Sequence, residues 1–410
     1  MKGFGEKPLY WLFLLSEKIG DRPAWKLAPL PLLMVAGTAW LWAGAGGRPP
    51  VAAAVGWAIA LLLLASSLAD LALFSSLPHR GLSFGPVPPP WLVMAGLRCV
   101  LALAALPLVA RWPVPALLGM AIVQACVWTL MAYGTLVEPF RLQLRHVELP
   151  SAKLSNPGTP LRIVHLSDLH VERLTRRERE VVGLVAGLEP DLIILTGDYL
   201  NTSFRRDPRA LSDLRTLLSQ LHAPGGIVAI WGTPQVDFPD VLRPVLAGVG
   251  IVLLEDEARE VVVRHHRLWL IGLATYRDLE LGGARLRELS ACAPPGAYTI
   301  LLHHTPDLMP QAAALGVDLV LSGHTHGGQW CLPWFGALHT SSRFWKRYES
   351  GHHQEGATHL NVSRGLGMEG YGLPRARFFC PPEVVSITIM ADKQAMPPWA
   401  ALTTNQGAKS

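Results

Sequence analysis

Four short clusters of Asp and His residues lie in the rear half of the sequence, each directly after a stretch that predicts a β-strand. They read Ser167-Asp168-Leu169-His170, Thr196-Gly197-Asp198, His303-His304-Thr305-Pro306 and Gly323-His324-Thr325-His326. Carboxylates and imidazoles suit divalent transition metals, and glycines permit tight turns. Residues i and i+2 of a loop can both turn inward, as in Asp168 with His170. One cluster alone is usually surface decoration or a turn, but four together predict a metal site.

The elements that must position these clusters alternate between short apolar strands and charged helices. We expect strands over 161–166, 191–196, 226–231, 260–264, 268–274, 298–303, 317–321 and 384–389, and helices over 175–188, 208–221, 284–291 and 307–315. Alternation of this kind is typical of an α/β sheet fold. Open α/β sheets bind ligands at the carboxyl ends of their strands, where the clusters fall.

The front of the chain is chemically different. The 410 residues include 36 Lys and Arg and 31 Asp and Glu, yet only five of these charged residues fall in 27–137. Four stretches there approach the roughly 20 apolar residues that a membrane span needs: 27–44, 51–77, 91–110 and 114–137. Trp25, Trp91 and Trp112 lie near their ends, as interfacial anchors do. We expect a four-helix transmembrane domain; helices buried in a large soluble core are the alternative.

The net charge of +5 belongs to this front part, because residues 138–410 carry 27 basic and 27 acidic side chains. The rear part therefore lacks the basic surplus of a nucleic-acid-binding domain. Five basic residues precede the first span, and Arg141, Arg145 and Lys153 follow the fourth. The positive-inside rule then predicts a multi-pass cell-membrane protein with both termini and the rear domain in the cytoplasm.

Asp70 and Arg98 are ionisable residues within the second and third predicted spans. Each lies seven residues from the connecting joint, at about 10 Å depth, so an antiparallel hairpin would place them level. Because such groups usually pair inside a bundle, we expect a structural salt bridge; a transport or proton-relay role is the alternative.

Residues 161–389 resemble the calcineurin-like metallophosphoesterases, in their membrane-associated bacterial branch. The motifs SDLH, TGD, HHTPD and LSGHTHGGQ and the closing segment NVSRGLG…RFFCPPEVV carry the resemblance. It implies a four-layer α/β/β/α sandwich with two divalent metal ions, for which Mn, Fe, Zn or Ni suit the ligands better than Ca. The implied ligands are Asp168, His170 and His326 for one metal, Asp198 as the bridge, and His304 and His324 for the second metal. His303 is instead expected in the core or behind the ligands.

The family's Gly-Asn-His-(Asp/Glu) motif is replaced here by Gly232-Thr233-Pro234-Gln235. The asparagine normally binds the second metal, and the histidine normally assists the transition state or the leaving group. His304 and Thr233 are therefore the candidate catalytic residues, and Asp237 or Asp240 is an alternative ligand. The second metal is expected to bind more weakly than the first.

The predicted function is hydrolysis of a phosphodiester or pyrophosphate near the membrane by attack of a metal-bound hydroxide. The alternative is a catalytically weak or inactive metal-binding scaffold or sensor, with a transporter as a distant third. The partners are the bilayer and a phosphoester, with a lipid-linked ester as one candidate. The aromatic stretch 330–335, with Phe344 and Trp345, either forms a lip for lipid or packs its loop onto the sheet.

These observations predict five regions. They are a basic N-terminal segment at 1–26, the transmembrane domain at 27–137, a linker at 138–160, the metallophosphoesterase domain at 161–390 and a disordered tail at 391–410.

Overall fold

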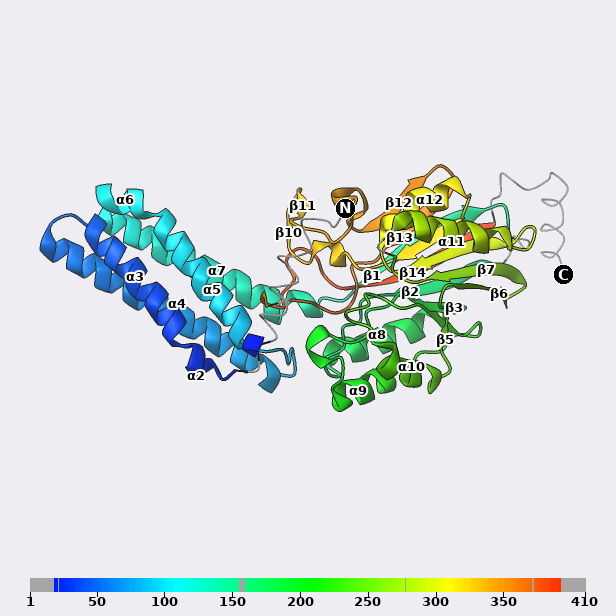
Figure 1. Ribbon diagram of the computed structural model, residues 1–410, viewed down its shortest axis with the longest axis horizontal. Helices are drawn as coiled ribbons and strands as arrows, with labels where there is room; N and C mark the ends of the chain where they lie inside the picture. The colour runs from blue at the N-terminus through cyan, green and yellow to red at the C-terminus, as the bar shows by residue number, and fades with distance from the viewer. Residues whose placement is uncertain (1–17, 21, 155–158, 277, 371, 392–410) are drawn as a thin grey trace, which may run out of the picture. The chain divides into compact units, whose positions relative to one another are not determined.

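The computed structural model describes residues 18–20, 22–154, 159–276, 278–370 and 372–391 (Figure 1). It divides into two compact units. The helical unit comprises the described residues up to Pro139 together with 369–377, and the sheet unit comprises the described residues of 140–368 and 378–391. The predicted tail, apart from Ala391, and most of the basic N-terminal segment lie outside the described residues.

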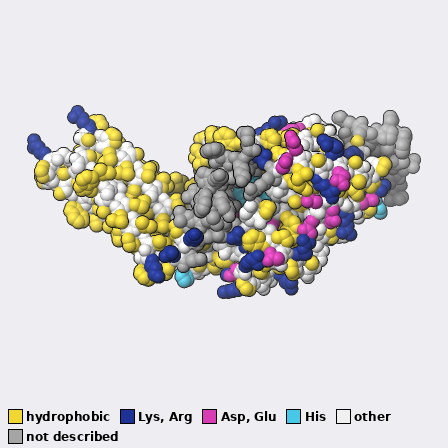
Figure 2. Space-filling model, viewed as in Figure 1, with side chains coloured by type: hydrophobic (Ala, Val, Ile, Leu, Met, Phe, Trp, Pro, Cys, Tyr) yellow, Lys and Arg dark blue, Asp and Glu magenta, His cyan; other side chains and the backbone are white. Residues whose placement is uncertain are grey.

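The helical unit contains apolar helices, several of which begin at a proline. They are α2 (Ala24–Leu27), α3 (Pro29–Ala45), α4 (Pro49–His79), α5 (Pro88–Ala104), α6 (Leu106–Arg111) and α7 (Pro113–Leu136). Three stretches of the described chain are long and apolar enough to cross a membrane: Ala24–Ala45, Pro49–His79 and Pro113–Phe140. Much of the surface of these helices is apolar (Figure 2).

The third predicted span, 91–110, differs from the structure because its helix is interrupted. Helix α5 has 17 residues, which rise about 25 Å, and α6 begins only after Ala105. Pro107 explains the break, since proline has no backbone N–H and its ring clashes with the carbonyl four residues earlier. The apolar stretch is therefore present, but not as one long helix.

The salt bridge predicted between the second and third apolar stretches is confirmed. The Arg98 guanidinium contacts both Asp70 carboxylate oxygens, at 2.6 and 2.7 Å, and both side chains are buried. Arg98 also donates to Oε1 of Gln124 on α7 at 2.7 Å, so the cluster joins α4, α5 and α7. Trp91 differs from its predicted role as an interfacial anchor, because its indole is buried and donates to Ser67 on α4.

The sheet unit contains two six-stranded mixed sheets. The first has the order β1 (Gln143–Ser151), β14 (Glu383–Ala391), β2 (Leu161–Leu166), β3 (Leu192–Leu195), β4 (Ile227–Ala229) and β5 (Val252–Leu253). The second has the order β12 (Gly351–Glu355), β13 (Thr358–Val362), β9 (Leu319–Ser322), β8 (Tyr298–His303), β7 (His266–Leu273) and β6 (Glu257–Val263). Strands β2 to β5 run parallel, as do β7, β8, β9 and β13.

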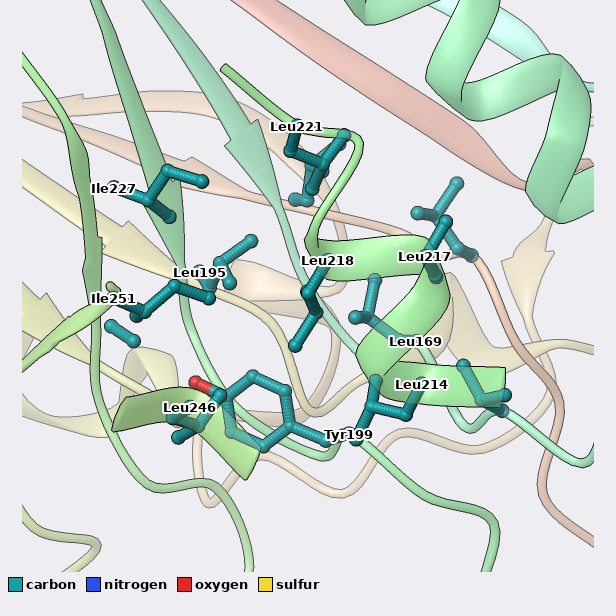
Figure 3. Close-up of a cluster of buried hydrophobic side chains, with 14 of the residues drawn as sticks. Leu169, Leu195, Tyr199, Leu214, Leu217, Leu218, Leu221, Ile227, Leu246 and Ile251 are labelled. Carbon is teal, nitrogen blue, oxygen red and sulfur yellow. The ribbon is translucent and has the colours of Figure 1, made fainter. Parts of the chain in front are cut away.

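Alternating side chains of these strands serve two different cores. Ile163 and Ile194 of the first sheet share one buried cluster with Leu270 and Leu302 of the second. The alternate residues of β2 and β3 instead pack against the helices α8 (Arg176–Leu188), α9 (Pro208–Leu218) and α10 (Pro239–Ala247), in the cluster drawn in Figure 3. Helices α11 (Leu279–Ala291) and α12 (Met309–Ala314) pack on the second sheet.

Two features of the sheet unit differ from the sequence predictions. Residues 143–151, expected within a linker, form the edge strand β1, which pairs in parallel with β14. Strands β5, β12 and β13, the short strands over 331–332 and 336–337, and helix α10 were not predicted. The pairing of β1 with β14 depends on a contact between distant parts of the chain, which the local sequence pattern does not specify.

Candidate metal centre

The predicted Asp and His residues come together at the carboxyl ends of parallel strands in both sheets. Loops after β2 and β3 carry Asp168, His170 and Asp198, and loops after β8 and β9 carry the remaining three. Backbone hydrogen bonds join the first two loops: the amide of Asp168 donates to Gly197 O and that of His170 to Asp198 O, each at 3.0 Å. The site therefore depends on the parallel pairing of β2 and β3, which places Leu166 opposite Leu195 and so ends both strands at the same level.

Six side chains form two groups of converging ligand atoms. The first group is Asp168, His170 and His326, and the second is Asp198, His304 and His324; within each group the atoms lie within 4.8 Å of one another. The two groups meet at Asp198, whose Oδ2 lies 3.6 Å from His170 Nε2 and 3.4 Å from His304 Nε2. One carboxylate oxygen is thus close to both groups. His303, which the sequence placed behind the ligands, belongs to neither group.

Five of these six residues have a left-handed backbone. The φ angles are 49° at Asp168, 39° at His170, 56° at Asp198, 68° at His324 and 52° at His326. Such values cost free energy in residues with a side chain, and persist only where the surroundings impose them. The loops that carry these residues are tightly packed against one another, since a Cβ on Gly323 would lie 2.1 Å from Asp168 Oδ2. Packing therefore pre-sets the direction of the ligands.

Thr233 lies beside the second group. Its hydroxyl oxygen is 3.2 Å from Asp198 Oδ2, 3.3 Å from His304 Nε2 and 3.4 Å from His324 Nδ1. Its backbone amide also donates to Asp198 Oδ1 at 2.6 Å. A neutral oxygen is therefore present where the resemblance places the asparagine amide.

Neither acidic alternative reaches the ligand groups. Asp237 is buried, and its carboxylate accepts from the backbone amides of Asp198, Tyr199 and Gly232 at 2.7–3.0 Å. It thereby ties the Thr233 loop to the Asp198 loop. Asp240 is exposed and forms an ion pair with Arg206 at 2.9 Å. The sequence offered Asp237 or Asp240 as a substitute ligand, whereas the contacts of Asp237 are those of a positioning residue.

The two histidines of the second group have opposite pKa shifts. Burial favours the neutral imidazole of His304, but the charge of Asp198 and a hydrogen bond to it outweigh burial and raise the pKa to about 10. Burial and then the positive charge of His304 lower the pKa of His324 to about 3. Burial raises the pKa of Asp198, but neighbouring imidazoles, His304 foremost, lower it overall. The carboxylate is thus held ionised and ready to meet a cation.

A buried polar network supports His304 from behind and was missed by sequence reasoning. His304 Nδ1 lies 2.7 Å from the Thr196 carbonyl oxygen, which leaves Nε2 directed at the ligand group. The Thr196 hydroxyl in turn contacts His165 Nε2 at 2.9 Å, and His165 Nδ1 contacts Asn361 at 3.1 Å. Burial lowers the pKa of His165 to about 3, so this imidazole is neutral. A histidine inside the apolar strand β2 was the available signal.

The donor set fits divalent metal ions on structural grounds. Nε2 of His170 and Nε2 of His326 lie only 3.1 Å apart, so both nitrogens face the same small space. His304 contacts a carbonyl through its other nitrogen, as metal-binding histidines usually do. Mixed imidazole and carboxylate donors suit transition ions rather than an all-oxygen Ca²⁺ site.

The aromatic stretch after His326 is packed in some places and exposed in others. Trp330 packs edge-on against Phe378, with ring centroids 5.0 Å apart, and Phe344 packs against a core cluster. By contrast, Trp334 is fully exposed, at 103%, and Phe335 is half exposed. Packing thus accounts for Trp330 and Phe344 and leaves Trp334, Phe335 and Trp345 exposed.

Comparisons with known proteins identify the family of this chain. The Bacillus subtilis protein "Uncharacterized metallophosphoesterase YkuE" is 29% identical over 262 residues, 63% of this chain and 88% of that protein. The Escherichia coli "Phosphodiesterase YaeI" is 30% identical over 244 residues, 57% of this chain and 83% of that protein. The chain belongs to the metallophosphoesterase family. The resemblance inferred from its motifs is thereby confirmed.

This metallophosphoesterase also resembles a curated pyrophosphatase. "UDP-2,3-diacylglucosamine pyrophosphatase LpxG" of Chlamydia muridarum is 26% identical over 316 residues, 64% of this chain and 94% of that protein. No protein-family model matches the chain. Members of this family are metal-dependent phosphoric ester hydrolases, so the prediction that the chain is a hydrolase of this class is confirmed.

Proposed function

We propose that this metallophosphoesterase is anchored in a membrane and hydrolyses a phosphodiester or pyrophosphate with two divalent ions. The position of Asp198 Oδ2, within 3.6 Å of a histidine from each ligand group, carries the proposal. Asp168, His170 and His326 hold one ion, and His304 and His324 hold the other, with Asp198 shared. Mn, Fe, Zn or Ni fits these donors.

The chain's own residues have separate roles in the proposed reaction. Two bound ions would supply Lewis-acid activation of water and neutralise charge on the phosphoryl oxygens. Asp198 would keep two bound cations close despite their mutual repulsion, and the Thr233 hydroxyl would add a neutral donor to the second position. His304 is oriented by the Thr196 carbonyl. Asp237 holds the Thr233 loop against Asp198.

The altered loop favours substrates with good leaving groups. Pro234 stands where the family has histidine, and proline cannot donate a proton. A pyrophosphate, or an ester of an acidic alcohol, departs without such help, whereas an alkoxide of high pKa does not. We therefore expect turnover to fall steeply as the pKa of the leaving group rises.

Hydrolysis of bis(4-nitrophenyl) phosphate by the full chain with Mn²⁺ tests the proposal. We expect turnover that chelation abolishes and that Asp198→Asn lowers at least about 100-fold, with normal folding in both proteins. Turnover that survives in Asp198→Asn would contradict the proposed site.

The second candidate is a metal-binding scaffold or sensor with little or no turnover. The replacement of the family's Asn-His pair by Thr233-Pro234 favours it. Metal binding without hydrolysis of either a phosphodiester or a pyrophosphate would support this candidate over the first.

We propose four membrane crossings, with α5 and α6 together forming the third. The basic flanks of the helical region favour a cytoplasmic sheet unit. The packing of α8 to α10 and of α11 and α12 on the two sheets supports a four-layer α/β/β/α sandwich, which begins at β1 rather than at residue 161 because β1 is the edge strand of the first sheet. The other regions proposed from the sequence are the basic N-terminal segment at 1–26, the transmembrane domain at 27–137, the connecting region at 138–160, which contains β1, and the tail at 391–410. A reporter that is active only outside the cytoplasm, fused after Ser410, should be silent; a strong signal would reverse the assignment.

A further inference from the structure

A short hairpin next to the metal centre exposes aromatic side chains. Strands β10 (Cys331–Leu332) and β11 (Gly336–Ala337) pair antiparallel, and residues 333–335 form the tip. We call residues 331–337 the aromatic hairpin. It begins five residues after His326, and the Trp330 ring packed on Phe378 anchors its base. Its position is thereby tied to the loop that carries a proposed ligand.

The exposed apolar side chains of the hairpin are contiguous. Leu332, Trp334 and Phe335 line one open cavity of about 350 Å³ together with Phe379 and Gly327. Trp334 is 103% exposed, and the three other apolar side chains are between 49% and 55% exposed. Single exposed apolar residues are ordinary, but a cluster of this kind marks an interaction surface. Gly327 adjoins His326, so the cavity lies beside the metal centre.

We propose that the aromatic hairpin inserts into the surface of a lipid bilayer and that the enzyme takes a phosphodiester presented there. The same polypeptide carries three helices long and apolar enough to cross a membrane, which favours a bilayer over a soluble protein as the occupant. Tryptophan concentrates at the membrane–water interface, where its ring meets both apolar and polar groups. The substrate class is then an amphiphile with an acyl chain and a phosphoryl group.

The charges near the hairpin suit this occupant. The Lys346 ammonium lies 3.8 Å from the centroid of the Phe335 ring and contacts the Ala337 carbonyl at 3.3 Å. Arg343 and Arg347 flank Lys346 in the sequence. Lys346 also pairs with Glu349 at 3.5 Å and Arg347 with Glu355 at 2.5 Å, so anionic headgroups would compete with these carboxylates for the two cations. Cations at the base of an apolar tip meet anionic headgroups when the tip enters the interface.

Photolabelling tests insertion without using activity. The full chain is reconstituted in vesicles of phosphatidylcholine and phosphatidylglycerol that contain a diazirine in the acyl chains, and labelled peptides are identified by mass spectrometry. We expect label in 331–338 as well as in the apolar helices, and at least a fivefold loss from the hairpin in Trp334→Glu/Phe335→Glu. Val262→Glu, at an exposed apolar position on β6, is the matched control and should not change hairpin labelling.

Label confined to the helices, or equal hairpin labelling in the wild type and the double variant, would overturn the inference. Trp334→Gln adds no charge, so a loss of label in it separates lost insertion from charge repulsion.

The substrate part of this inference rests on the proposed function and needs a second measurement. We compare a diacylglycerol 4-nitrophenyl phosphodiester in vesicles with water-soluble bis(4-nitrophenyl) phosphate. The ratio of lipid to soluble turnover should fall at least tenfold in the double variant and stay constant in Val262→Glu; an unchanged ratio would overturn the substrate assignment. If the wild type hydrolyses neither compound, the proposed function fails, and the labelling result alone decides insertion.

Discussion

Asp237 shows how one buried carboxylate can organise a site without binding the metal. It accepts from three backbone amides on two loops, those of Asp198, Tyr199 and Gly232. Burial, followed by the nearby charge of Asp198, raises the pKa of Asp237 to about 7, so its surroundings disfavour the ionised carboxylate. The loop that carries Thr233 therefore depends on a residue outside both ligand groups.

We predict that Asp237→Asn destabilises the sheet unit by about 1–3 kcal/mol. The introduced NH2 group would face a backbone N–H, and it cannot accept a hydrogen bond from that donor. Thermal unfolding of the full chain in detergent measures this change. Asp240→Asn removes only an exposed ion pair and should cost about 0–1 kcal/mol. Equal effects of the two substitutions would contradict the role given to Asp237.

At the scale of elements, the Asp70–Arg98–Gln124 cluster joins three apolar helices through buried polar contacts. Removing one charge leaves the other buried without its partner, which costs about 3–5 kcal/mol. We predict that Asp70→Ala and Arg98→Ala each lower the melting temperature in detergent more than the double variant does. If all three variants have the same melting temperature, the pair does not stabilise the bundle.

Helix α8 begins with a capping box, and the contribution of its Glu178 carboxylate to stability depends on pH. Thr175 accepts from the Arg177 amide, and the buried Glu178 carboxylate accepts from the Thr175 amide at 2.8 Å. Burial raises the pKa of Glu178, but the charge of Arg177 and several hydrogen bonds outweigh it and lower the pKa below its ordinary 4.5. The ionised carboxylate thus stabilises the fold above about pH 4.5, and this stabilisation is lost as the pH falls through the lowered pKa.

We predict that Glu178→Gln, which keeps an oxygen for the cap, costs about 1.5–3 kcal/mol at pH 7. The difference from the wild type should shrink as the pH falls below 4.5. Melting temperatures of both proteins across this range measure it. A difference that does not depend on pH would show that the charge of Glu178 contributes nothing.

At the scale of the whole molecule, the sequence predicted what local patterns encode. The bounds of β2 and β8 match to the residue, because both are short apolar runs ended by polar clusters. Asp70 and Arg98 were paired correctly, because equal depth in a hairpin is simple geometry. The exposed tip at Trp334 was left open between two arrangements, because exposure depends on what packs nearby.

Long-range contacts could not be predicted in the same way. The strand β1 pairs with β14 from the far end of the chain, and Gln124 joins the salt bridge from a third helix. The left-handed backbone of five proposed ligands follows from close packing between loops, which no local pattern records. The interruption after Ala104 did have a local signal, Pro107, which the apolar run concealed.

The most direct test of the central claim is the number of Mn²⁺ ions bound per chain, titrated by electron paramagnetic resonance in the wild type and in Thr233→Val. We predict two ions in the wild type, the second bound more weakly, with spin coupling between them because Asp198 is shared. Thr233→Val should weaken only the second ion, by about 10- to 100-fold. Binding of only one ion at all Mn²⁺ concentrations would contradict the shared centre. Two ions without spin coupling, whose affinities are the same in the wild type and in Thr233→Val, would also contradict it.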